Sequence, residues 1–365
     1  MRGMTWDHSR GYDPLAAASR LWEARTGQAI RWDRRSLQDF ESYPVDELAR
    51  AYDLIVIDHP HVGQVAKEGC LLPFDHGLDA IAKGSVGGSF ESYFWQGRQW
   101  ALPIDAAAQV QAWVPARRDA PVTGWGELAA LAKRGGLALP LRPPHSLMSL
   151  FTLCGLSGIP LTVEGPDLFP AQAEEAAALL AELSAAVDPA MFTMDPIAVL
   201  EAMADSAAAL EVAPLVYGYV SYAADGFRDT RIAFADIPAI GATGPSGSAL
   251  GGTGIAVSAY ADDPEAAADF ARWVASGAVQ RDLFATHGGQ PAHGDAWEAD
   301  SVNAPVADFY RATRKTLDRA WLRPRHDGYM GFQHDASERL NRGLKAGEEP
   351  ASIIAALNTR FRESL

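Results

Sequence analysis

The sequence is poor in cysteine. Its 365 residues include two cysteines, Cys70 and Cys154, and neither lies in a Cys-x-x-Cys pair or beside a histidine. Both stand in apolar stretches, where free cysteine behaves as a small hydrophobic side chain. We therefore interpret them as buried packing residues rather than as a disulfide or a nucleophile.

Positive charge and long apolar runs are also scarce. The chain has 31 Lys and Arg against 46 Asp and Glu, a formal net charge of −15. This excess of negative charge argues against nucleic acid and anionic membrane surfaces as partners. No stretch reaches the 18 or more apolar residues of a membrane span, and residues 1–14 contain no hydrophobic signal-peptide core. Either an export signal has been removed or the protein stays in the cytoplasm, and the sequence leaves both open.

The composition that is present is that of a globular protein with two domains. Hydrophobic residues make up 48% and charged residues 21% of a chain longer than single cores usually allow. Strand patterns alternate with helical periods from the start, which predicts βαβ units and a parallel sheet with helices on its faces. The predicted strands are residues 1–7, 29–32, 53–57 and 100–104, and the first predicted helix is 12–26, closed by Gly27.

The second half of the chain is richer in predicted helices. An extended apolar segment, 103–115, is long enough to pass from one domain to the other. We expect a helix from about Thr123, whose hydroxyl would cap it, and then a strand and loop over 137–145. Further predicted elements are helices 146–156, 171–187, 198–210, 263–276 and 351–361, a Gly-rich linker 241–252 and a strand 254–258.

The most informative stretch is 52–75, YDLIVIDHPHVGQVAKEGCLLPFD. Leu54–Ile57 is a continuous run of branched apolar side chains, typical of a strand covered on both faces. Asp58, His59 and His61 follow it directly. Because ligands of open α/β sheets bind outside the carboxyl ends of the strands, we expect a site at these three side chains.

Five segments, in order, resemble one known family. They are 53–75, YFWQGRQWALPID, VTGWGELAALAKRG, the Gly-rich strand LGGTGIAVS and the helix and turn that follow it to GGQPA. This order is similar to that of the extracellular solute-binding proteins of ABC importers, in the maltose-binding-like group. The resemblance implies an α/β, two-lobed periplasmic-binding-protein-like II fold, each lobe a mostly parallel sheet flanked by helices, hinged about a ligand cleft.

The resemblance also implies the domain boundaries, partners and location. Lobe one would contain residues 1–107 and 249–297, and lobe two residues 108–248 and 298–365 with the C-terminal helices. The protein would bind a small polar solute, act as a monomer without cofactors, deliver the solute to the membrane permease of an ABC transporter, and work in the periplasm.

Twelve residues map to the cleft in this resemblance, and each has a structural alternative. His8 and Arg325 would otherwise be solvated, Asp58 would cap the next helix, Arg142 would be a rigid surface residue, and Tyr217 would belong to a half-buried strand. Free N–H groups at the helix after Arg142 would favour an anion. The set is His8, Asp58, His59, His61, Arg142, His145, Ser146, Tyr217, Gly252, Thr253, Arg325 and Tyr329.

The mapped cleft is rich in His and Arg, and the position after Pro214, often aromatic in sugar-binding relatives, is Leu215. This composition predicts a small hydroxylated carboxylate or sugar-like solute rather than a neutral oligosaccharide.

Two other functions fit the same residues. An enzyme on this fold would use His8, Asp58, His59 and His61, with or without a zinc ion, although no HExxH or GxSxG motif is present. A ligand-sensing subunit that reports to a protein partner would share every feature of the clamp.

Overall fold

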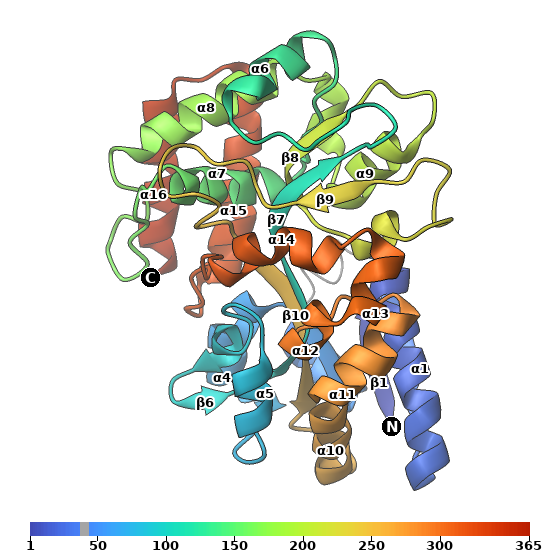
Figure 1. Ribbon diagram of the computed structural model, residues 1–365. Helices are drawn as coiled ribbons and strands as arrows, with labels where there is room; N and C mark the ends of the chain where they lie inside the picture. Colours follow the sequence, from blue (N-terminus) through green and yellow to red (C-terminus); the bar gives the residue numbers. More distant parts are fainter. Residues whose placement is uncertain (37–43) are drawn as a thin grey trace. The chain divides into compact units, whose positions relative to one another are not determined.

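The computed structural model describes residues 1–36 and 44–365, which form two compact units (Figure 1). Unit 1 contains residues 1–107, 251–304 and 325–327. Unit 2 contains residues 108–250, 305–324 and 328–365. The sequence-based boundaries stand at 107/108, 248/249 and 297/298, so the observed division differs at 249–250, 298–304 and 325–327.

Residues 298–304 stay in unit 1 because side-chain amide bonds hold them there. The amide of Asn303 donates to the carbonyl oxygens of Trp297, at 2.8 Å, and Ala299, at 3.0 Å. Asn303 is fully buried, so these bonds satisfy an amide that water cannot reach. The short helices α12 (Gly294–Glu298) and α13 (Asp300–Asn303) are thereby joined.

The sheet of unit 1 begins with three parallel strands, β2, β1 and β3. Strand β1 (Arg2–Trp6) pairs in parallel with β2 (Arg31–Arg35) on one side and with β3 (Leu54–Ile57) on the other. Strand β10 (Leu250–Ser258) pairs antiparallel with β3, and the short β4 (Leu71–Leu72) pairs with β10. The strand predicted at 29–32 is observed at 31–35, where it pairs with β1. Of these five residues only Trp32 is buried in the core.

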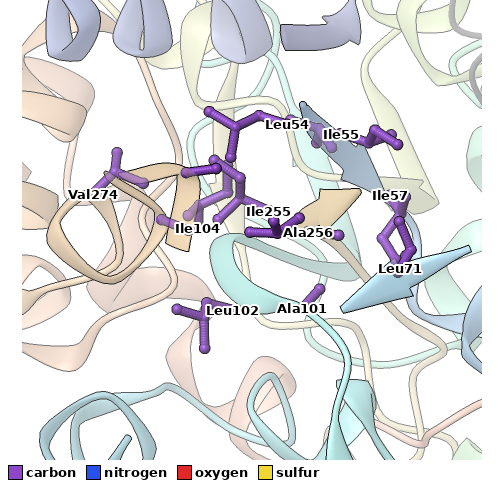
Figure 2. Packing of buried hydrophobic residues seen from close by; sticks show 14 of the residues in the cluster. Leu54, Ile55, Ile57, Leu71, Ala101, Leu102, Ile104, Ile255, Ala256 and Val274 are labelled. Carbon is purple, nitrogen blue, oxygen red and sulfur yellow. The ribbon is translucent and has the colours of Figure 1, made fainter. Parts of the chain in front are cut away.

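Apolar side chains from distant segments fill the core of unit 1 (Figure 2). All four residues of β3 are buried, as its unbroken apolar run predicts. Ile255 and Ala256 of β10 and Leu102 and Ile104 pack in the same cluster. Strand β3 is therefore covered on both faces.

Helices and a small hairpin complete unit 1. Helix α1 ends at Gly27, whose left-handed φ of 78° lets its N–H bond to the carbonyl of Glu23. The hairpin consists of β5 (Phe94–Trp95) and β6 (Arg98–Gln99). The helices are α1 (Ser9–Thr26), α3 (Val45–Ala51), α4 (Val62–Glu68), α5 (Asp79–Gly84), α10 (Pro264–Val274) and α11 (Gly277–Val279), besides α12 and α13.

Two long strands run from one unit into the other. Strand β7 (Leu102–Trp113) is the extended apolar segment predicted from the sequence, and the unit boundary falls after Ala107. Strand β10 returns from unit 2 after Leu250. The sheet order places β10 between β3 and β7.

In unit 2, β7 pairs antiparallel with both β8 (Val212–Tyr217) and β9 (Ala233–Ala235). Helix α7 is apolar on nearly all sides and is buried along its length, as expected for a core helix. It contacts α8 and α15, which both contact α16. The helices are α6 (Gly126–Lys133), α7 (His145–Leu156), α8 (Ala173–Ala185), α9 (Pro196–Ala204), α14 (Phe309–Asp318), α15 (Tyr329–Ala346) and α16 (Pro350–Ser364).

Two local predictions in unit 2 are wrong. Helix α6 begins at Gly126, and the capping bond runs the other way, from the N–H of Thr123 to the carboxylate of Glu127. Residues 137–145 do not form a strand, since Leu137 makes an isolated bridge to Val212 and the chain then leads into α7. In the described residues no helix is both long enough and apolar enough to span a bilayer.

Candidate functional site

The polar residues after β3 form a compact turn at its carboxyl end. The carboxylate of Asp58 accepts a hydrogen bond from the backbone N–H of His59, at 2.8 Å, and lies 3.1 Å from Nδ1 of the same imidazole. His59 and His61 stand in a short 3-10 turn that leads into α4, and both side chains are buried. The capping role that the sequence left open for Asp58 is therefore real, and it also orients the His59 ring.

The register between β3 and β10 brings Thr253 to the same edge. Gly254 lies opposite Ile57, so Thr253 comes next to Asp58. The Oγ1 of Thr253 is buried and makes no hydrogen bond to the described residues. A hydroxyl in this state needs a partner, which a bound solute or water would supply.

Gly252 has a packing role that the sequence did not indicate. Its φ is +100°, and a Cβ at this position would come within 2.3 Å of the carbonyl oxygen of Asp105. The missing side chain thus lets β10 approach β7, and the approach of a ligand to this backbone stays a prediction.

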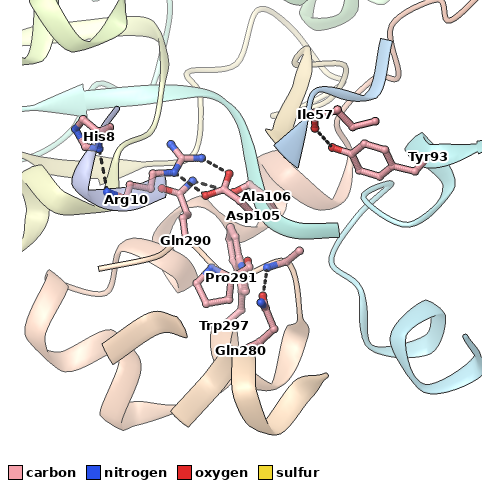
Figure 3. Close-up of polar contacts among 11 residues, drawn as sticks. His8, Arg10, Ile57, Tyr93, Asp105, Ala106, Gln280, Gln290, Pro291 and Trp297 are labelled. Atoms are coloured by element: carbon pink, nitrogen blue, oxygen red, sulfur yellow. Dashed lines mark hydrogen bonds and ion pairs between the residues drawn. The ribbon is translucent and has the colours of Figure 1, made fainter. Parts of the chain in front are cut away.

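Tyr93 contacts this turn and is not among the twelve residues that the sequence analysis named. Its hydroxyl donates to the carbonyl oxygen of Ile57 at 3.2 Å (Figure 3), and its ring meets the His59 ring edge-on at 6.3 Å. The signal was present, because Tyr93 opens the aromatic hairpin segment that carries the family resemblance.

Arg325 is held by backbone groups of unit 1. Its Nη1 donates to the carbonyl oxygens of Glu91, Ser92 and Phe94, at 2.7, 3.1 and 3.0 Å. Burial lowers the pKa of this guanidinium from its usual range. In this role one residue anchors segment 325–327, and a contact between Arg325 and a ligand carboxylate stays a prediction.

Helix α4 packs against the same segment, 325–327. A Cβ on Gly63 would lie 1.9 Å from the carbonyl oxygen of Arg325, so only glycine allows this contact. Lys67 adds an ion pair to Asp327 at 2.5 Å.

His8 caps α1 and adjoins a buried ion pair. Its Nδ1 accepts a hydrogen bond from the backbone N–H of Arg10 at 3.0 Å (Figure 3). The guanidinium of Arg10 donates to both carboxylate oxygens of Asp105, from Nε at 2.8 Å and from Nη2 at 2.5 Å. The capping bond fixes the position of the His8 imidazole at the carboxyl end of β1.

In unit 2, the first turn of α7 presents two buried polar groups. The Nδ1 of His145 and the Oγ of Ser146 make no hydrogen bond to the described residues. The backbone of the turn is engaged differently from the prediction: the N–H groups of His145 and Leu147 donate to Arg142 and Pro144. The turn therefore offers side-chain groups more than the free N–H groups that the sequence analysis expected.

Charged residues near His145 influence its pKa. Burial is the main cause that lowers this pKa to about 4; the charges of Arg142 and Arg323 act in the same direction, and the charge of Asp195 opposes them. The imidazole is thus uncharged near neutral pH and acts as one donor and one acceptor. Arg142 lies 3.7 Å from the carboxylate of Asp195, and Nη1 of Arg323 donates to Gln333 at 3.0 Å.

The two predicted tyrosines, Tyr217 and Tyr329, lie in different environments. Tyr217 ends β8, is half-buried, and meets the His145 ring at 6.3 Å and 70°. Tyr329 is fully buried and packs against Phe332 at 5.8 Å in α15, the environment of a core residue.

The structure therefore places eight of the twelve predicted residues in two groups. Within unit 1, Asp58, His59, His61 and Thr253 gather at the carboxyl end of β3. Within unit 2, Arg142, His145, Ser146 and Tyr217 gather at the start of α7. Among residues 1–36 and 44–365, no three His, Cys, Asp or Glu side chains are placed to hold a metal ion, so the zinc alternative gains no support.

The model of the bacterial extracellular solute-binding protein family matches residues 47–308, well over half of the chain. The chain belongs to this family. A small-molecule ligand and the permease subunits of a transporter are accordingly the partners of this solute-binding protein, and its family is extracellular or periplasmic. Nothing in the comparisons supports the enzyme alternative.

Solved structures share the complete fold of this solute-binding protein. An ABC transporter solute-binding protein from Thermotoga lettingae bound with alpha-D-tagatose has a TM-score of 0.84 at 16% identity, covering 100% of this chain and 98% of its own. A second from Agrobacterium radiobacter, in complex with ribitol, has a TM-score of 0.79 at 17% identity and coverage of 100% and 98%. The maltotriose-binding protein of Thermus thermophilus has a TM-score of 0.74 at 18% identity and coverage of 99% and 98%. No curated protein matches the sequence significantly.

Proposed function

We propose that this solute-binding protein, as a periplasmic monomer, closes its two units around one uncharged, polyhydroxylated solute, a sugar or a sugar alcohol. The observation that carries the proposal is the state of the charged groups: Arg142 faces Asp195, Arg325 is bound to carbonyl oxygens, and His145 is neutral. The side chains available for a ligand are then mainly neutral donors and acceptors, which suit hydroxyl groups.

Two groups of residues would contact the solute. Asp58, His59, His61 and Thr253 would do so from unit 1, and His145, Ser146 and Tyr217 from unit 2. The buried Thr253, Ser146 and His145 atoms that make no hydrogen bond to the described residues support this assignment, because buried polar groups are nearly always paired when a protein is in its working state. The tagatose and ribitol bound by the similar structures support the same ligand class.

This proposal replaces the preference for a carboxylate that the sequence composition suggested. That preference depended on Arg142 and Arg325 as cations for the ligand, and both have partners within their own units. The neutral alternative needs no desolvation of an additional charge on binding.

A thermal-shift screen of sugars, sugar alcohols and sugar acids tests the ligand class. A ligand present at 100 times its Kd adds about 2.7 kcal/mol to the free energy of unfolding, so binding raises Tm measurably. We expect a neutral polyol or sugar to give the largest shift, and small-angle scattering to show a smaller radius of gyration in its presence. A sugar acid that gives the largest shift would contradict the neutral ligand.

Histidine variants test the site. We expect His59→Ala and His61→Ala to reduce the ligand-induced shift by weakening binding at least tenfold, with little loss of apo stability. His76→Ala is the matched control, because His76 also lies in unit 1 but its side chain is 73% exposed. If both site variants lose apo stability and keep the full ligand shift, these histidines are structural.

A further inference from the structure

Asp195 is the acidic group beside the first turn of α7. It precedes Pro196 and caps α9, with Oδ1 accepting a hydrogen bond from the N–H of Ala198 at 2.9 Å. Its second oxygen, Oδ2, lies 3.7 Å from Nη1 of Arg142, and its side chain is 23% exposed. One carboxylate therefore serves both the helix and a neighbouring cation.

The backbone fixes this pair in place. The N–H of Arg142 donates to the carbonyl oxygen of Met194 at 3.1 Å, which joins the two loops directly. The buried amide of Asn341 donates to the carbonyl oxygens of Leu141, at 2.7 Å, and Phe192, at 3.3 Å. These hydrogen bonds hold the backbone next to Arg142 and next to Asp195. The distance between the two side chains is therefore limited by the backbone as well as by their rotamers.

Arg142 of this pair stands just before the first turn of α7, whose buried polar atoms could form hydrogen bonds with a ligand. His145 experiences the charges of Asp195, Arg142 and Arg323. The Nδ1 of His145 and the Oγ of Ser146, both buried, make no hydrogen bond to the described residues. Asp195 thus acts on the neutral imidazole with a negative charge, and Arg142 and Arg323 act on it with positive charges.

We propose that Asp195 determines the charge selectivity of the solute site by holding Arg142 in an ion pair and repelling anionic solutes. This inference rests on the proposed function, since it concerns the same site. With Asp195 present, the carboxylate of a sugar acid meets a like charge and a cation that is already paired. In Asp195→Asn the negative charge that faces Arg142 is gone, and a carboxylate on the solute takes its place.

Asp195→Asn tests the inference without removing the helix cap, because Asn caps helices about as well as Asp. The probes are ribitol against ribonate and galactose against galacturonate, with Kd measured by calorimetry at low salt. We expect Asp195→Asn to shift the ratio of affinities at least tenfold toward the acid, and added salt to reduce the gain. The double variant Asp195→Asn with Arg142→Gln should lose most of this gain.

Asp263→Asn is the matched control. Asp263 also precedes a proline and caps a helix, α10, through a bond from the N–H of Ala266 at 3.0 Å, but it lies in unit 1. We expect this variant to leave the selectivity ratio unchanged.

The outcomes separate the two proposals. If the wild type binds the neutral probes and Asp195→Asn keeps the same selectivity, the inference is wrong and the proposed function stands. If the wild type prefers the acids, both are wrong. If no sugar, polyol or sugar acid of the full screen binds, the proposed ligand class itself is wrong and the inference with it.

Discussion

The buried pair of Arg10 and Asp105 predicts that losing both charges costs less stability than losing either one. The Arg10 side chain is 4% exposed and that of Asp105 is fully buried. Removing one partner of such a pair typically costs about 3–5 kcal/mol, because the other charge stays buried without compensation, whereas apolar replacement of both is often near neutral. Arg10→Met and Asp105→Leu should therefore each destabilise unit 1 strongly, and the double variant should be more stable than either.

The pH dependence distinguishes the two single variants. Burial raises the pKa of Asp105, and Arg10 opposes this shift. In Arg10→Met the opposing charge is gone, so the folded-state pKa of Asp105 stands above its unfolded value near 4. Between these two pKa values the folded state binds more protons than the unfolded state, so stability increases as the pH falls. Arg10→Met should thus recover stability from pH 8 to pH 5, whereas Asp105→Leu should not, because arginine keeps its proton.

Urea unfolding at both pH values, followed by circular dichroism and tryptophan fluorescence, measures these effects. The expected coupling energy in the double-variant cycle is about 3 kcal/mol, similar to the roughly 4 kcal/mol attraction of charges 4 Å apart at an effective dielectric constant near 20. Additive losses in the double variant would refute the reasoning. A loss in the free energy of unfolding of Arg10→Met that is the same at pH 8 and pH 5 would also refute it.

Two further predictions follow from buried groups. Because the folded-state pKa of His145 is about 4, below the unfolded value near 6.5, the unfolded state binds more protons between these values, and the free energy of unfolding should fall by up to about 1.4 kcal/mol per pH unit on acidification. His145→Gln should flatten this part of the pH profile, and an unchanged profile would contradict the assignment. Gly252→Ala should destabilise the protein by more than about 1 kcal/mol, because its Cβ would come within 2.3 Å of the Asp105 carbonyl oxygen at a φ of +100°. Gly97→Ala is the control in the same denaturation assay, since Gly97 has a φ of +78° but no atom within 4 Å of such a Cβ.

Local patterns predicted much of the fold. The apolar run Leu54–Ile57 and the period of α1 with its terminal Gly27 are properties of neighbouring residues, and both predictions are confirmed. The strand predicted within the strand and loop 137–145 is wrong because an apolar, proline-containing segment can also be buried without pairing along its length. Whether such a segment forms a strand depends on pairing with a distant segment, which local patterns do not show.

Part of the candidate site was predictable, because some of its residues are neighbours of a predicted strand in the sequence. Asp58 and His59 stand directly after a predicted strand, so their position followed from the chain order. The approach of Asp195 to Arg142 depends on backbone bonds between two loops, which no spacing in the sequence indicates. The bonds of Arg325 to carbonyl oxygens were not predictable either, because the sequence does not distinguish an arginine that binds carbonyl oxygens from one that binds a carboxylate.

The pairing of β10 with β3 has a consequence for the order in which the protein is made. Gly254 pairs with Ile57, which leaves the ribosome about 200 residues earlier. At 5–20 residues per second, β3 waits roughly 10–40 s for its neighbour, with an open apolar strand edge that other chains can join. Unit 1 is complete only after residue 327, and unit 2 only with the last helix, α16. The first segment to be synthesised therefore finishes folding at nearly the same time as the last.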